Sequence, residues 1–200
     1  STASTFSSYT PTVGDEIILS GTISEYYYMT ELSSPTLVSV VRSGVVLDTE
    51  LSPVIANPPA SLADANRYWE RLESMRVQVP ANSIVLGGRN VFSPADAEIW
   101  VANPASTVGL RVAPYTNRAF RDAHPLDDNY DAATWDGNGY RILMGSLGVK
   151  ATAGDAQTLI DPARTFSTVT NAPVGGLNYT FNKYRIEISS QPTFSEGLDP

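Results

Sequence analysis

The sequence lacks cysteine altogether and contains a single histidine and few charged residues. Without cysteine the chain has no disulfides, thiolate nucleophiles or cysteine metal sites. One histidine, His124, excludes a histidine cluster. No apolar run approaches the roughly 18 residues that a transmembrane helix needs. We therefore expect no membrane insertion.

What is present favours a folded acidic protein. Of the 200 residues, 42% are hydrophobic, which is enough to bury a core. The 13 basic and 21 acidic residues give a formal net charge of -8. The electrostatic field of the whole protein therefore disfavours binding of nucleic acid. Nucleic acid as a partner would require a local concentration of basic residues. Few lysines and many small polar residues fit an extracellular or cell-surface location.

Strand patterns dominate the chain. Residues 15–28 are rich in β-branched and aromatic side chains and predict a long strand, in which Gly21 marks a bulge or bend. A second strand is expected at residues 30–32. Residues 36–41 and 45–47 flank Arg42-Ser43-Gly44 and predict a hairpin. Further strands are expected at residues 76–80, 84–86, 98–101 and 140–144, and two strands within 174–188, joined by a turn at Asn182-Lys183.

One segment has a helical period instead. Apolar and aromatic side chains recur at helical spacing from Leu62 through Trp69 to Met75, and Ser61 can act as the N-cap. We predict one helix over residues 63–73, with Trp69 packing it on a sheet. Residues 103–139 lack periodicity and predict a long surface loop. The chain is thus expected to be mainly β, as a barrel or a sandwich.

Four stretches resemble, in order, sequence patterns of secreted bacterial nucleases of the endonuclease/exonuclease/phosphatase superfamily. Residues 13–32 are similar to a "vGD.v.v.G.v.E…TeL" pattern that precedes the catalytic domain. Residues 69–77 are similar to "yEgMlV", with Ser74 in place of glycine. Residues 141–146 echo "RivLDDGS" without its acidic pair, and residues 174–186 are similar to "v.GvldYsFgnYrl".

The resemblance implies one or two OB-like β-barrels with a single α-helix and a long surface loop. Residues 1–60 would form a partial OB-like module, and residues 61–200 a second one with helix 63–73 and loop 103–139. The implied role is a non-catalytic accessory or substrate-positioning region of a secreted nuclease. The metal-dependent phosphodiesterase domain would lie downstream, so no catalytic residue is expected in this segment.

A second hypothesis comes from the strands that begin the first barrel in the family, which are missing here. A sheet with an open edge pairs readily with another chain. The chain could then be a structural subunit of an extracellular or cell-surface assembly, such as a filament or adhesin, joined by β-strand complementation. The expected partners are other domains of the same chain or neighbouring copies, through open β edges.

An acidic run provides the candidate metal ligands. Ca²⁺ takes six to eight oxygen ligands, and one loop offers several: Asp127, Asp128, Asn129, Asp131, Asp136 and Asn138. The spacing does not match an EF-hand. A solvated loop of Asx turns explains the same residues without calcium. His124 lies near two acidic residues, but one histidine cannot supply the catalytic set that the superfamily implies.

Three consecutive tyrosines form the other candidate site. Tyr26, Tyr27 and Tyr28 could stack on bases or sugars, as aromatic faces of OB-type barrels do. In a strand Tyr26 and Tyr28 would share one face, and core or rim packing is the commoner role for such side chains. Glycan binding by these tyrosines is a third hypothesis. Asn178 begins an N-glycosylation sequon inside a predicted strand.

Overall fold

The computed structural model describes residues 9–59, 61–93, 96–103, 139–147 and 160–196. The chain divides into two compact units, Ser1–Pro53 and Val54–Pro200. The described residues form ten strands and two helices, which confirms a mainly β protein. The modules predicted for residues 1–60 and 61–200 stay predictions.

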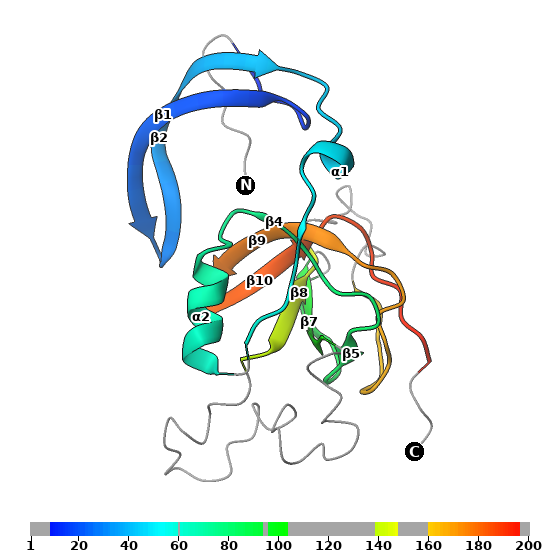
Figure 1. Ribbon diagram of the computed structural model, residues 1–200. Coiled ribbons are helices and arrows are strands. Elements are labelled where there is room, and N and C mark those ends of the chain that lie inside the picture. The colour runs from blue at the N-terminus through cyan, green and yellow to red at the C-terminus, as the bar shows by residue number, and fades with distance from the viewer. Residues whose placement is uncertain (1–8, 60, 94–95, 104–138, 148–159, 197–200) are drawn as a thin grey trace. The chain divides into compact units, whose positions relative to one another are not determined.

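The first unit is built on one long antiparallel hairpin, shown in blue in Figure 1. Strand β1 (Glu16–Tyr26) pairs with β2 (Met29–Arg42), and the register shifts between Ser20 and Thr22. This shift confirms the bulge expected at Gly21. A Cβ at Gly21 would lie 2.9 Å from Leu32 Cγ, so the missing side chain makes room for Leu32.

The hairpin predicted around Arg42-Ser43-Gly44 is wrong. Strand β2 runs through to Arg42, and a one-turn helix, α1 (Leu47–Glu50), follows in place of the expected strand. Gly14 and Gly44 both have positive φ, and Val45 N donates to Gly14 O at 2.8 Å. The chain therefore turns back toward the start of β1 instead of forming a second hairpin.

The second unit contains one mixed sheet, most of whose strands are labelled in Figure 1. Its hydrogen-bonded order is β3-β4-β9-β10-β8-β7-β5, with β6 paired to β7. Its strands are β3 (Val54–Ile55), β4 (Arg76–Gln78), β5 (Ile84–Val85), β6 (Asn90–Ser93), β7 (Asp96–Ala102), β8 (Arg141–Gly145), β9 (Val174–Thr180) and β10 (Lys183–Ile188). The pairs β3–β4 and β8–β10 are parallel and the other pairs are antiparallel. The hydrogen-bonded order is open, so a closed OB-like barrel is not confirmed.

Helix α2 (Leu62–Glu70) confirms the helix expected from the sequence, although it ends three residues earlier. The Ser61 hydroxyl caps it by accepting from Asp64 N at 3.4 Å. Beyond Glu70 the chain tightens into turns, and Ser74 adopts φ +61. Because α1 is also helical, the expectation of a single helix is wrong, but α2 is the only described helix of the second unit.

The core of the second unit lies between α2 and one face of the sheet. Ala65 and Trp69 face inward from the helix, and Trp69 is only 6% exposed, as expected for an anchor. The sheet contributes buried aliphatic side chains from every second residue of its strands: Val77, Ile99, Val101, Ile142, Met144, Leu177, Ile186 and Ile188. This alternation leaves the other face of β7, β8 and β10 for a different set of side chains.

Candidate functional site

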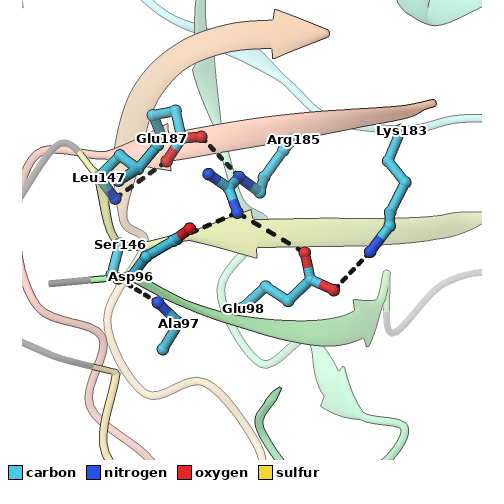
Figure 2. Close-up of polar contacts among 8 residues, drawn as sticks. All are labelled: Asp96, Ala97, Glu98, Ser146, Leu147, Lys183, Arg185 and Glu187. Carbon is cyan, nitrogen blue, oxygen red and sulfur yellow. Dashed lines mark hydrogen bonds and ion pairs between the residues drawn. The ribbon is translucent and has the colours of Figure 1, made fainter. Parts of the chain in front are cut away.

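The second face of β7, β8 and β10 holds a buried charge cluster. We use this name for Asp96, Glu98, Lys183, Arg185 and Glu187 (Figure 2). The strand register places Glu98 of β7 and Glu187 of β10 on either side of Gly145 of β8. A Cβ at Gly145 would lie 2.5 Å from Arg185 Cδ. The glycine therefore gives Arg185 room to lie across β8 between the carboxylates.

Arg185 is the centre of the charge cluster. Its Nε donates to Glu187 Oε1 at 2.5 Å, and its Nη1 lies 3.1 Å from Asp96 Oδ1 and 3.6 Å from Glu98 Oε2. Lys183 Nζ donates to the other oxygen of Glu98 at 2.6 Å. The side chains of Arg185 and Glu98 are 2% and 3% exposed. The cluster thus joins β7 and β10, the two strands on either side of β8, through charge-assisted hydrogen bonds around a buried arginine.

Backbone groups complete the surroundings of the charge cluster. Leu147 N donates to Glu187 Oε2 at 3.0 Å, and the Ser146 hydroxyl accepts from Ala97 N at 2.7 Å. Arg185 Nη2 is buried and makes no hydrogen bond within the described part of the chain. Burial raises the pKa of Glu187, and the neighbouring Arg185 opposes this rise. Each carboxylate of the cluster contacts a cation, an arrangement suited to holding strands together.

The raised pKa of Glu187 predicts a pH dependence of stability. A carboxyl group whose pKa is higher in the folded chain stabilises the fold fully below the unfolded pKa, and this contribution is lost as pH rises through the folded pKa. We expect the wild type to lose stability relative to Glu187→Gln as pH rises from about 4 to about 7, by denaturant unfolding. A constant difference between the two proteins over that range would contradict this assignment.

The second candidate is the end of the hairpin, which we call the tyrosine tip: Tyr26, Tyr27 and Tyr28. Tyr27 and Tyr28 form the two-residue turn between β1 and β2, at φ 49° and 64°. The three side chains are 59%, 79% and 75% exposed, so the expectation of core or rim packing is wrong. The rings of Tyr26 and Tyr27 meet edge to face, with centroids 4.6 Å apart.

The two faces of the hairpin differ in chemistry. The strand register puts aliphatic side chains on one face, which we call the apolar face: Ile17, Leu19, Ile23, Leu32, Leu37 and Val40. Hydroxyl side chains gather on the opposite face, where Ser20 and Thr36 are hydrogen bonded at 2.7 Å. Ile23 is 68% exposed and Val40 39% exposed. No described large hydrophobic side chain of this unit is fully buried.

The other predicted site residues are not brought together by the described structure. The six calcium candidates, Asp127, Asp128, Asn129, Asp131, Asp136 and Asn138, lie outside the described residues, as does His124. Within the described ranges no group of three or more acidic or histidine side chains is arranged to hold a metal ion. Asn178 lies half-buried in β9.

Sequence reasoning missed the charge cluster, although a signal was present. Lys183, Arg185 and Glu187 alternate along one segment, and Asp96 and Glu98 alternate along another. In a strand such spacing places all charges on one face. The predicted turn at Asn182-Lys183 removed Lys183 from its strand, whereas the turn is formed by Phe181 and Asn182, at φ 50° and 61°.

Comparisons with known proteins give no relative for this chain. No protein-family model, no curated protein and no solved structure matches it. Among the described helices, none has the length and apolar character needed to cross a membrane.

Proposed function

We propose that this chain is a non-catalytic accessory module with an OB-like strand order, serving as a substrate-positioning region of a secreted nuclease. The observation that carries the proposal is the way strands of the second unit are paired. The nuclease activity of the parent protein is inferred from the resemblance to secreted nucleases of the endonuclease/exonuclease/phosphatase superfamily.

The strand order supports an OB-like connectivity. Strands β4 and β5 lie near opposite ends of the hydrogen-bonded order, yet only residues 79–83 separate them in the chain. Taken as one bent strand, β4 and β5 pair with β9 on one side and β7 on the other. Among the other pairs, β7–β8 and β10–β9 are antiparallel and β8–β10 is parallel, while the short strands β3 and β6 pair with β4 and β7. This connectivity is similar to the Greek-key order of a five-stranded, partly open OB barrel, which supports the proposal.

The bend between β4 and β5 has local causes. Pro80 cannot donate a hydrogen bond to a neighbouring strand, and Asn82 adopts φ +61 and donates from its backbone N to Val169 O at 2.8 Å.

Ser74 also supports the resemblance, because it adopts φ +61 at the position where the family pattern has glycine. Glycine is the residue that takes positive φ most readily.

The charge cluster is consistent with a non-catalytic role. Its described carboxylates are joined to Arg185 and Lys183 within a buried network that links β7 and β10. Such pairing serves strand attachment.

The test of the accessory role is the reading frame of the gene together with an activity assay. We expect the frame to continue past Pro200 into a metal-dependent phosphodiesterase domain. The isolated 200-residue chain should not hydrolyse DNA with Mg²⁺, Mn²⁺ or Ca²⁺. A stop codon directly after Pro200, or hydrolysis by the isolated chain, would contradict the proposal.

A second candidate function is a subunit that assembles with neighbouring copies, and the hairpin favours it. A two-stranded ribbon is marginally stable in water on its own. Among the described strands β1 and β2 pair only with each other, so each has an outer edge able to accept a third strand. A copy of the same hairpin would supply such a strand and cover the apolar face.

Light scattering at increasing protein concentration tests this assembly, with parallel samples containing calcium or a chelator. Assembly through the hairpin predicts oligomers in the wild type that are lost in Ile23→Ser/Val40→Ser. The control Thr22→Ser on the hydroxyl face should behave as the wild type does. A monomer at all concentrations would exclude assembly and leave the accessory module. Loss of oligomers on chelation would link assembly to the predicted calcium ligands.

A further inference from the structure

We propose that the tyrosine tip is a binding site for neutral saccharides. This proposal concerns a ligand of the hairpin and stands apart from the parent activity and the oligomeric state. It rests on three properties of Tyr26, Tyr27 and Tyr28: their exposure, their backbone conformation and the charges around them.

The backbone of the turn is unfavourable for tyrosine. A two-residue turn with positive φ at both positions is the type that favours Asn-Gly, because bulky side chains strain the left-handed region. Tyr27 and Tyr28 occupy both positions, and their side chains are 79% and 75% exposed. Neither ring gains the burial that would offset this strain. Strained residues of this kind are found at functional sites, and the charges around the tip indicate which ligand it would bind.

The surrounding charges select the class of ligand. The hairpin from Glu16 to Arg42 has three acidic residues and one arginine, and that arginine pairs with Glu16 at the end away from the tip, so the charge near the tip is negative and disfavours nucleic acids and anionic lipid surfaces. Glu25 and Glu31 are both exposed near the tip, and Thr30 Oγ1 donates to Glu25 Oε1 at 2.6 Å. Carboxylates accept hydrogen bonds from hydroxyl groups, which a saccharide offers in numbers and without negative charge.

The geometry of the tyrosine rings fits the apolar face of a sugar. A pyranose ring has a face of C–H groups that stacks on an aromatic ring, while its hydroxyls lie at the rim. Tyrosine combines an apolar ring with a polar hydroxyl and suits such a mixed surface. Tyr26 and Tyr27 lie 79° apart in ring plane, so the tip presents two ring faces in different directions. Successive units of an oligosaccharide can contact both.

The experiment uses the full 200-residue chain on an array of neutral, sialylated and sulfated glycans, followed by titration calorimetry with the neutral oligosaccharides that score highest. The test variant is Tyr27→Asn/Tyr28→Gly, which removes two rings and installs the preferred turn pair. We expect saccharide affinity to fall at least about tenfold while the unfolding temperature stays the same or rises. Loss of binding therefore cannot be attributed to unfolding of the hairpin.

The second hairpin turn provides a matched control. Phe181 and Asn182 have positive φ like Tyr27 and Tyr28, and Phe181 is 83% exposed, but their turn joins β9 and β10 in the second unit. The variant Phe181→Asn/Asn182→Gly should bind the saccharide as the wild type does. The proposal is overturned if no neutral glycan binds, if only sulfated or sialylated glycans bind, or if Tyr27→Asn/Tyr28→Gly retains wild-type affinity.

Discussion

Arg185→Met is expected to lower the free energy of unfolding by about 3–5 kcal/mol, because it leaves buried carboxylates without their central cation. Arg185 contacts Asp96, Glu98 and Glu187, and its side chain is 2% exposed. Methionine keeps much of the aliphatic length over Gly145, so the loss reports on charge more than on packing. Equilibrium unfolding in urea measures the effect through the transition midpoint.

The matched control is Arg42→Met in the first unit. Arg42 also contacts two carboxylates, at 2.6 Å from Glu16 and 2.5 Å from Glu50, but its side chain is 53% exposed. Water and salt screen exposed ion pairs, so we expect a much smaller loss of stability than in Arg185→Met. Equal losses in the two variants would show that burial of the charge cluster does not set the energy of its ion pairs.

Gly175→Ala is expected to destabilise the fold by about 3 kcal/mol, or to prevent folding, since the sheet has no space for a side chain there. A Cβ at Gly175 would lie 2.2 Å from the backbone O of Glu187 and 2.8 Å from Ile188 Cα. Gly175 pairs with Ile188 of β10 and with Val77 of β4. Relief of the clash would therefore require the strands to separate, and backbone atoms cannot rotate away as a side chain can.

The neighbouring Gly176 is the control. A Cβ at Gly176 would meet no atom within 4 Å, and its φ lies outside the left-handed region. We expect Gly176→Ala to change stability by no more than about 0.5 kcal/mol. Thermal unfolding of the two variants side by side distinguishes a clash at Gly175 from a general effect of substituting alanine for glycine in β9. Similar losses in both would contradict the assigned pairing of β9.

Elements with a strong local pattern were predictable from the sequence. The β-branched run of β1 and the capped helical period of α2 need no tertiary information, and Trp69 follows from the helical period. The full length of β2 was not predictable, because Pro35 interrupts the pattern. The proline is tolerated since it lies in an edge strand beside the register shift near Gly21.

The charge cluster depended on contacts that no local pattern specifies. Arg185 and Asp96 are 89 residues apart, and their strands lie on either side of β8. The gap at Gly145 through which Arg185 crosses is likewise a tertiary feature. The exposure of the tyrosine tip was not predictable either. Tyrosine favours strands, but Tyr27 and Tyr28 form the two-residue turn between β1 and β2. Calcium binding by the acidic run stays a prediction.

We propose that the second unit folds on its own with an OB-like strand order and that the hairpin is available for binding. Hydrogen exchange of the full chain in dilute solution, resolved by mass spectrometry, tests it directly. We predict slow exchange in β7, β8, β9 and β10 and fast exchange in β1 and β2. The hairpin should become protected only when a saccharide or a further copy of the chain is added. Exchange in β1 and β2 as slow as that in β8, in a dilute monomer without ligand, would contradict the account.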